Sequence, residues 1–413
     1  MQRNQLFLND CLIGLKEIPD NSIDCCVADP PYGIRFMGKK WDYDLPPVEI
    51  WNEVFRVLKP GAHALVACGT RTQHRMVCNV EDAGFEVRDV ITWHYGSGFP
   101  KSLDVAKDID RIAGARREYK TTGSPVKRII PGAHQNRTGS WIKDDGRTYT
   151  SSVSDPVTDE AKQWDGWGTA LKPATEFWTL VRKPLQGTVA QNVLANGVGA
   201  LNIDSCRIAT EDKLGGGSKD SPSFAAGKEG WDRPWMHDAE AVQNRADRVQ
   251  ANVQKAEELG RWPANVILDD FMAEKMDEQS GELTTGAQQP VKRANRDSYS
   301  GNMPEYTNYS CEKNSGGASR FYYVAKPSPE ERGAYNKHPT VKPLALMTYL
   351  IKMVCPVEPG RIVLDPFAGS GTTLIAAGLL GLDFVGYEQD PESHATATRR
   401  LRDILGLFYN PAR

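Results

Sequence analysis

Cysteine pairs of the kind that bind zinc are missing from this 413-residue chain. Its eight cysteines are scattered, and no two of them form a Cys-x-x-Cys pair. A structural zinc site or a disulfide framework is therefore not expected, and reduced thiols in a cytoplasmic protein are the simpler interpretation. No combination of side chains in the motifs below completes a metal site either.

Long apolar runs and an excess of positive charge are also missing. No stretch approaches the ~20 apolar residues of a membrane-spanning helix. The N-terminus, MQRNQLFLNDCLIGL, has no apolar core ending in a cleavage site, so we expect neither export nor a membrane location. The 50 Lys and Arg residues face 53 Asp and Glu residues, a net charge of −3. If nucleic acid is a partner, it must meet a local basic surface.

Short apolar strands alternate with helices at both ends of the chain, a pattern typical of a parallel sheet covered by helices. The strands expected in these two blocks are 5–10, 25–28, the second part of 58–69, 85–95, 320–327, 361–365 and 383–388. The helices expected there are 11–24, 47–58, 71–83, 343–355, 372–380 and 391–405. Between the blocks lies an irregular, locally basic region in which we expect strands only at 174–184, 199–208 and 261–268.

The stretch CVADPPYGIRF (25–35) ends a buried strand with a carboxylate and two prolines. Proline has no backbone N–H, so Pro30 and Pro31 offer only carbonyl acceptors on a stiff backbone. The Asp29 carboxylate is also acceptor-only when it is ionised. Such a loop suits a partner that donates, such as an amino group, on a ring that Tyr32 could stack against. Alone, the stretch could equally be an ordinary turn at the end of a strand.

The stretch VLDPFAGSGTT (363–373) joins a strand to a helix through a glycine-rich turn. Its glycines let the backbone approach a ligand, and the following helix N-terminus favours a carboxylate or phosphate. A nucleotide P-loop would need a Lys before the threonines, and the dinucleotide motif would need a third glycine. About one strand later FVGYEQD (384–390) contains Glu388, at a place where related folds bind ribose hydroxyls. A nucleoside that carries a carboxylate, such as S-adenosylmethionine, fits these features best.

Taken together and in this order, the two stretches resemble those of the amino-group DNA methyltransferases, which methylate adenine N6 or cytosine N4. The family's catalytic loop corresponds to DPPY (29–32) and its cofactor loop to FAGSG (367–371). The segment HPTVKP (338–343) resembles the family's HPTxKP, which closes over the methionine end of the cofactor. A catalytic loop that precedes the cofactor loop is the order of the β group.

The resemblance implies a circularly permuted class I, Rossmann-like α/β methyltransferase sheet of seven strands, with a large target-recognition insertion. Residues 85–95 and 174–184 would form its antiparallel edge hairpin. The implied domains are a catalytic half (1–98), an insertion (99–172), a returning core strand (173–184), a target-recognition region (185–320) and a cofactor-binding half (321–413).

The resemblance also implies roles for residues in both loops. The catalytic residues would be Asp29, Pro30, Pro31 and Tyr32. The residues that bind S-adenosylmethionine would be Asp10, Lys342, Asp365, Pro366, Phe367, Ala368, Gly369, Ser370, Gly371 and Glu388. Asp29 and the Pro30 carbonyl would each accept one amino hydrogen of a flipped base, which frees the nitrogen lone pair for attack.

The substrate and partners follow from the same resemblance. Asp at the first position of the loop favours adenine N6, with cytosine N4, and then an RNA or protein amino group, as alternatives. Double-stranded DNA is the expected partner; a homodimer and a separate restriction endonuclease are left open. The basic residues Arg116, Arg117, 291–296 and Arg320 could contact DNA phosphates or simply face solvent. The tryptophans, among them Trp164 and Trp167, are expected mostly in the core.

Overall fold

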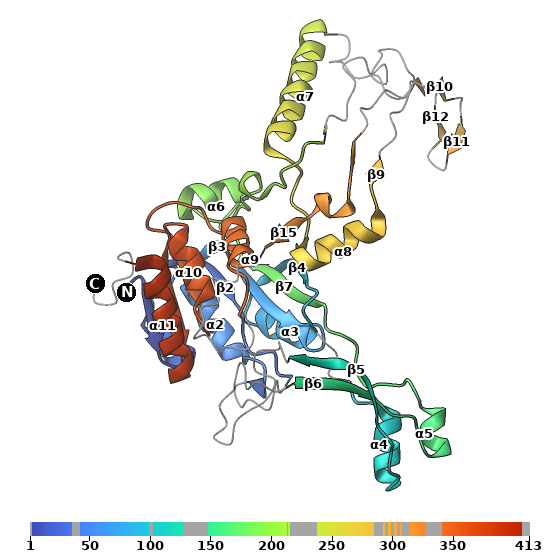
Figure 1. Cartoon of the computed structure of the whole chain (residues 1–413). Coiled ribbons are helices and arrows are strands. Elements are labelled where there is room, and N and C mark those ends of the chain that lie inside the picture. The colour runs from blue at the N-terminus through green and yellow to red at the C-terminus, as the bar shows by residue number, and fades with distance from the viewer. Residues whose placement is uncertain are drawn as a thin grey trace. The chain divides into compact units, whose positions relative to one another are not determined.

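The computed structural model describes residues 2–34, 42–98, 102–127, 148–212, 214, 238–284, 292–293, 296–298, 301–303, 306–307, 314–326 and 341–406. These residues belong to two compact units (Figure 1). The first holds the described parts of 1–95, 175–332 and 341–413, and the second holds those of 96–174. Both sequence motifs lie in the first unit.

A single large sheet forms the centre of the first unit. Among the described residues its nine strands run in the order β1-β17-β16-β2-β3-β7-β4-β8-β15. Their bounds, in that order, are Gln5–Leu8, Asp383–Glu388, Ile362–Asp365, Ile23–Ala28, Leu58–Gly69, Thr175–Arg182, Glu86–His94, Val266–Asp269 and Tyr323–Ala325. Strands β16 and β2 are buried along their whole length, as expected of central parallel strands that read as continuous apolar runs.

Strand β7 is the one strand of this described sheet that runs against the others. It pairs antiparallel with both β3 and β4, whereas the remaining pairs are parallel. Its first residues therefore lie at the edge of the sheet where the parallel strands end. Glu176 sits opposite Gly69 at the end of β3 and opposite Trp93 near the end of β4.

Helices cover both faces of this sheet, and two apolar cores result. One face is covered by α1 (Cys11–Gly14), α2 (Val48–Val57) and α3 (Gln73–Asp82), which contribute buried Trp51 and Met76 to one core. The other face is covered by α9 (Leu344–Val354), α10 (Thr372–Leu379) and α11 (Pro391–Leu405), which contribute Leu346 and Leu374 to the other core. Figure 1 shows the last three helices in orange and red.

Further elements lie outside these layers. The first unit also contains α6 (Val189–Asn196), α7 (Ala239–Leu259), α8 (Asp270–Ser280), the 3₁₀ turns Leu15–Glu17, Asp204–Cys206 and Ala318–Phe321, and the strand pairs β9–β14 (Leu283–Thr284, Ser315–Gly316), β10–β13 (Lys292–Arg293, Tyr306–Thr307) and β11–β12 (Arg296–Ser298, Gly301–Met303). The second unit contains α4 (Val105–Ile112), the hairpin β5–β6 (Lys120–Lys127, Thr148–Val153) and α5 (Asp159–Gln163).

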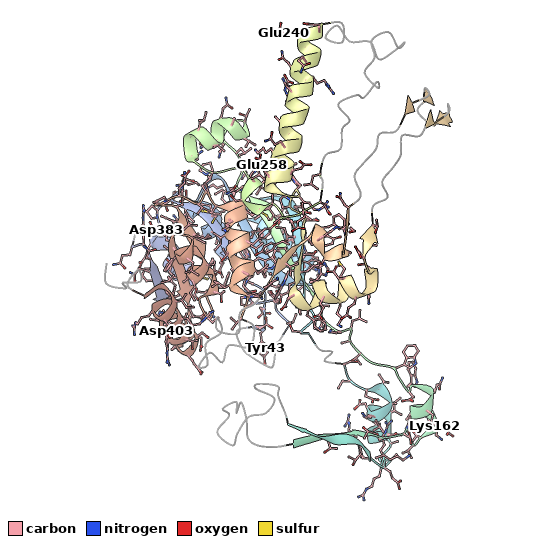
Figure 2. All side chains as sticks on the ribbon, turned by 45° about the horizontal axis from the view of Figure 1, so that its top comes forward. Tyr43, Lys162, Glu240, Glu258, Asp383 and Asp403 are labelled. Atoms are coloured by element: carbon pink, nitrogen blue, oxygen red, sulfur yellow. The ribbon has the colours of Figure 1, made fainter. Side chains whose placement is uncertain are left out.

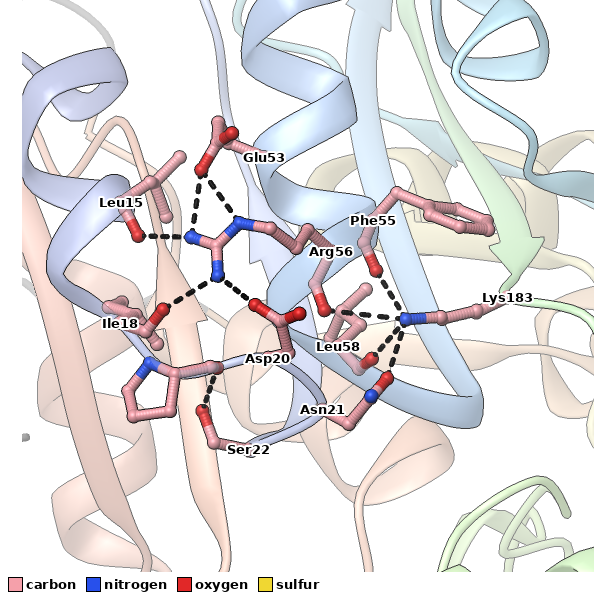
Figure 3. A network of polar contacts seen from close by, with 11 residues as sticks. Leu15, Ile18, Asp20, Asn21, Ser22, Glu53, Phe55, Arg56, Leu58 and Lys183 are labelled. Carbon is pink, nitrogen blue, oxygen red and sulfur yellow. Dashed lines mark hydrogen bonds and ion pairs between the residues drawn. The ribbon is translucent and has the colours of Figure 1, made fainter.

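A polar network fixes the chain where it enters β2, the strand that leads to the DPPY loop (Figure 3). Arg56, near the end of α2, donates to the carbonyls of Leu15 and Ile18, both at 2.8 Å. Lys183, just after β7, donates to several acceptors, among them the Leu58 carbonyl at 2.8 Å. Burial lowers the pKa of this lysine. Arg56 thus ties α2 to the turn before β2, and Lys183 donates to carbonyls at the end of α2 and the start of β3.

The expected Rossmann-like α/β sheet is confirmed, with β2, which leads to the DPPY loop, ahead of β16, which leads to the FAGSG loop, along the chain. Two details of the expectation were wrong. The sheet has nine described strands instead of seven, because β8 and β15 continue it beyond β4. The antiparallel pair β4–β7 exists, yet it does not form the edge of the sheet, because β8 pairs with the other side of β4.

Three local expectations also need correction. Residues 199–208 form no strand; a 3₁₀ turn and a single bridge from Ile208 to Arg261 take its place. The first helix is a short α-turn that continues as a 3₁₀ turn. Helix α7 was not foreseen, although Val242, Ala246, Val249 and Val253 recur in the sequence at helical spacing. Figure 2 labels Glu240 and Glu258, which lie near its two ends.

Candidate active site

Four carboxylates follow four neighbouring strands at one edge of the sheet. Asp10 comes just after β1, Glu388 ends β17, Asp365 ends β16 and Asp29 follows β2. These strands are mutually parallel, so their carboxyl ends meet at the same edge. Open α/β sheets bind their ligands at this edge. The structure thus brings together the acids that the sequence singled out.

Backbone hydrogen bonds hold the DPPY loop in one shape. The buried Asp42 carboxylate accepts from the Tyr32 N–H at 2.7 Å and the Gly33 N–H at 3.0 Å. The Thr72 hydroxyl donates to the Tyr32 carbonyl at 2.6 Å. Gly33 has a φ of +65°, a backbone conformation that residues other than glycine rarely adopt. The loop is therefore built into a fixed turn after β2.

The Asp29 side chain is held at both oxygens. Its Oδ1 accepts from the Tyr32 hydroxyl at 2.9 Å, and its Oδ2 forms an ion pair with Lys342 Nζ at 2.9 Å. Burial, followed by the charge of Asp29, raises the pKa of the Tyr32 phenol well above its usual value, so this hydroxyl stays a donor. Each Asp29 oxygen keeps one further lone pair for a ligand.

Lys342 lies between two carboxylates. Besides Asp29, its ammonium is 3.2 Å from Glu176 Oε2 on β7, and it donates to the Tyr32 hydroxyl at 3.3 Å. Burial alone would lower the pKa of Lys342, but the charges of Asp29 and Glu176 keep it above its usual value. Burial raises the pKa of the Glu176 carboxyl, and the Lys342 ammonium offsets part of this effect. These contacts place Lys342 at the DPPY loop, and the cofactor contact expected for it stays a prediction.

The FAGSG loop is tied to the acids on either side of it. Asp365 Oδ1 accepts from the Phe367 N–H at 3.0 Å, and Glu388 Oε2 accepts from the Gly369 N–H at 2.8 Å. Gly369 and Gly371 have φ values of +52° and +80°. A Cβ on Gly371 would come within 3.0 Å of the Ala397 side chain on α11. Both glycines are thus required by the turn itself.

Asp365 is the most perturbed acid of this edge. Its side chain is buried, and burial raises its pKa to about 7 despite hydrogen bonds from Thr373 and the Phe367 N–H. Burial also raises the pKa of Glu388. Among the described residues no cation pairs with Asp365. A buried carboxylate in this situation suits a cationic ligand group, because that charge would restore the ionised form.

Arg400 on α11 supports the same loop from behind. This fully buried side chain donates to the Ser370 carbonyl at 2.5 Å, to the Ser370 hydroxyl at 3.1 Å and to the Thr372 hydroxyl at 3.0 Å. The contacts join the cofactor loop to the first turn of α10. Asp10, by contrast, caps α1 by accepting from the Leu12 N–H at 2.8 Å.

Four residues of this site were missed by reasoning from the sequence: Asp42, Thr72, Glu176 and Arg400. None belongs to a recognisable motif, since each acts through a contact between elements distant in sequence. Glu176 had one usable signal. An acid at the first turn of a strand expected to run antiparallel must lie where the parallel strands end.

Two candidate DNA-contacting arginines have structural roles instead. Arg117 forms an ion pair with Asp110 at 2.6 Å, and both side chains are buried. Arg320 forms an ion pair with Asp212 at 2.9 Å and donates to the Gly317 carbonyl at 2.8 Å. Much of the candidate segment 291–296, and residues 338–340 of HPTVKP, lie outside the described residues.

The tryptophans divide between core and surface, so the expectation that they are mostly core is only partly met. Trp51, Trp93 and Trp178 are buried. Trp164 and Trp167 of the second unit are exposed and contact each other edge to face, with ring centroids 5.0 Å apart. Across the part of the chain that the structure describes, no helix is both long and apolar enough to span a membrane.

Comparisons with known proteins identify the family. The N6/N4 methyltransferase family, described as DNA methylase, matches residues 23–399. The Type II methyltransferase M.HindIII of Haemophilus influenzae is 52% identical over 450 residues, which covers 98% of this chain and 97% of that protein. The Type II methyltransferase M2.MboI of Moraxella bovis is 33% identical over 111 residues, or 26% of this chain and 40% of that protein.

Solved structures of lower similarity were also found. The complex of M1.HpyAVI with S-adenosylmethionine has 15% identity and a TM-score of 0.38, covering 96% of this chain and 99% of that one. The cytosine-N4-specific PvuII DNA methyltransferase has 12% identity and a TM-score of 0.42, covering 100% and 94%. From the family match and the close Type II relative, this chain belongs to the N6/N4 family of DNA methylases, whose methyl donor is S-adenosylmethionine.

Proposed function

We propose that this DNA methyltransferase acts on the N6 amino group of adenine in double-stranded DNA. The observation that carries the proposal is the DPPY loop, in which Asp29 is held with acceptor positions to spare next to a proline carbonyl. Asp rather than Ser at the first position of this loop favours adenine within the family.

The residues around the FAGSG loop fit the methyl donor. Asp365 would face its cationic amino group, and the loop from Phe367 to Gly371, at the start of α10, would accommodate its methionine part. Glu388 would bind the ribose of the cofactor, and Asp10 would contact its adenine. When bound, S-adenosylmethionine supplies an electrophilic methyl group on its sulfonium.

The DPPY loop would prepare the amino nitrogen of the base. An exocyclic amino nitrogen is a weak nucleophile because its lone pair is delocalised into the ring. If Asp29 and the Pro30 carbonyl each accept one N–H, the nitrogen can become pyramidal and direct its lone pair at the methyl group. The nitrogen becomes positive as it reacts, and a nearby carboxylate stabilises that charge and is placed to accept the proton it then loses.

Reaching this loop requires the base to leave the helix. Tyr32 would stack on the extruded base, a contact typically worth about 1–3 kcal/mol. Its ring already packs against Gly69, where a Cβ would lie 3.2 Å from Tyr32 Cδ2. The aromatic face is thus fixed before the base arrives.

The Type II names of the relatives support a partner restriction endonuclease for this chain as well. A homodimer remains a prediction from the family resemblance. Target recognition by residues 185–320 also stays a prediction, and the described strand β8 shows that part of this range belongs to the central sheet.

Nucleoside analysis of methylated DNA tests the proposal. The protein is incubated with S-adenosylmethionine and unmethylated duplex DNA of varied sequence, and the nucleosides are separated by mass spectrometry. N6-methyladenine is the expected product. N4-methylcytosine as the product would be consistent with the mechanism but would show that cytosine is the target base. If no methylated base forms while the protein still binds the cofactor, an RNA or protein substrate is favoured.

A further inference from the structure

Glu176 is a carboxylate that neither sequence motif contains, yet it lies among the residues of the DPPY loop. The antiparallel direction of β7 brings it to the edge where the parallel strands end, opposite Gly69. Its side chain is 14% exposed and faces the Lys342 ammonium at 3.2 Å. Lys342 pairs with Asp29 Oδ2 at 2.9 Å as well, so this lysine joins the two carboxylates.

We propose that Glu176 is a positioning residue for methyl transfer, which holds Lys342 so that the ammonium fixes the Asp29 carboxylate in its reactive orientation. This inference rests on the proposed function, because it assigns Asp29 the role of accepting a hydrogen bond from the amino group of the base. It adds a residue from the returning strand, and it gives Lys342 a task at the base rather than at the cofactor.

The bonding at Lys342 supports this arrangement. The ammonium donates to the Tyr32 hydroxyl at 3.3 Å and forms ion pairs with Asp29 Oδ2 at 2.9 Å and Glu176 Oε2 at 3.2 Å. The Lys342 side chain is only 7% exposed, so water cannot readily replace a lost partner. Without Glu176, the ammonium would be free to turn toward another acceptor and to release Asp29.

The balance of charge in the cluster points the same way. One ammonium between two carboxylates leaves one negative charge over when all three are ionised. That charge suits a neutral amino group that becomes positive as it is methylated, since a fixed charge stabilises the transition state more than the ground state. Lys342 paired with Asp29 alone would cancel the charge of Asp29, so Glu176 preserves that charge by balancing the lysine.

Glu176→Gln and Lys342→Met test the proposal in the full-length protein. Glu176→Gln keeps the shape and removes the charge, and we expect kcat to fall on the order of 100-fold, as misplaced catalytic groups do. Lys342→Met is expected to lose at least as much. The affinity for S-adenosylmethionine, measured by calorimetry, should stay unchanged in both variants if Lys342 acts at the DPPY loop and not at the cofactor. Lys342→Arg, which keeps the charge, should recover part of the lost rate.

The double variant separates positioning from an independent role. If Glu176 acts through Lys342, Glu176→Gln costs nothing further in kcat once Lys342 is Met. The double variant should also be more stable than Lys342→Met alone, because it leaves one carboxylate of the cluster without a cation instead of two. Glu86→Gln is the matched control: it removes an ion pair of 2.6 Å to Arg182, at the opposite end of β7. It should leave kcat unchanged.

Each outcome bears on one of the two claims. Three results would overturn the inference while the wild type still methylates DNA. They are additive losses in the double variant, a normal kcat in Glu176→Gln, and a Lys342→Met variant that loses mainly cofactor affinity. If the wild type itself methylates no base, the proposed function fails first, and this is seen before any variant is made.

Discussion

Asp365 is the residue at which proton binding and cofactor binding are expected to compete. Burial holds its pKa at about 7, whereas an ordinary aspartate titrates near 3.8. A cationic amino group binds the carboxylate form and not the neutral acid. Lowering the pH through about 7 therefore protonates Asp365 and should weaken cofactor binding, and raising the pH should restore it.

Calorimetric titration of S-adenosylmethionine between about pH 5.5 and 8.5 checks this expectation, because this pH range lies on both sides of the raised pKa of Asp365. The dissociation constant should rise by up to about tenfold for each pH unit below the pKa of Asp365. Asp365→Asn should bind weakly and without this dependence. An equal pH dependence in the wild type and in Asp365→Asn would assign the titration to another group.

Tyr32 offers a second prediction at this scale, because its ring and its hydroxyl have separate tasks. Tyr32→Phe keeps the ring and removes the hydroxyl, which donates to Asp29 Oδ1 and accepts from Lys342. A hydrogen bond to a charged group is worth about 1.5–3 kcal/mol, so single-turnover methyl transfer should slow by about tenfold or more. Tyr32→Ala also loses the stacking surface and should weaken binding of the extruded base. Equal rates in Tyr32→Phe and the wild type would show that the hydroxyl does not orient Asp29.

Among the elements, α11 decides how firmly the cofactor loop is held. Arg400→Met would remove three hydrogen bonds from the Ser370–Thr372 turn, at a site where the arginine is fully buried. Losing a buried network of this kind typically costs about 2–4 kcal/mol of folding free energy. We expect a lower melting temperature together with weaker cofactor binding.

Arg399 is the control for this prediction, since it is the next residue of the same helix. Its side chain is 61% exposed, and its ion pair with Asp403 spans 3.7 Å. Arg399→Met should change stability by no more than about 0.5 kcal/mol. Similar losses from the two substitutions would mean that α11 is sensitive to any lost charge, and not to the loop contacts of Arg400.

The elements also show which parts of the fold the sequence could predict. Strands β2 and β16 read as continuous apolar runs that end in an acid, so Asp29 and Asp365 could be found together with their strands. Strands were expected at 261–268 and 320–327, where β8 and β15 lie, but no local pattern shows that these two strands continue the sheet beyond β4. Glu176 depends on the register of β7 against β3, which no local pattern contains.

For the molecule as a whole, the second unit is an insertion into a hairpin. His94 of β4 pairs directly with Thr175 of β7, and the described residues of 96–174 form a separate compact unit. Replacing 96–174 by a short Asn-Gly turn should therefore leave the sheet intact, since such turns join antiparallel strands with the right twist.

The shortened protein separates folding from DNA binding. It should bind S-adenosylmethionine as the full chain does, because the FAGSG loop and its supports all lie in the first unit. If the insertion contacts DNA, duplex affinity should fall by about tenfold or more and lose part of its salt dependence. A shortened protein with full DNA affinity would assign recognition to the first unit alone.

The most direct test of the whole account is single-turnover methyl transfer to unmethylated duplex DNA by Asp29→Asn beside the wild type. This substitution keeps the size of the side chain and removes the carboxylate that Tyr32 and Lys342 hold in place. The account predicts that transfer to adenine N6 falls on the order of 100- to 1,000-fold, while cofactor binding is retained. Transfer by Asp29→Asn at the wild-type rate would contradict it, because the acceptor chemistry of the DPPY loop would then not drive the reaction.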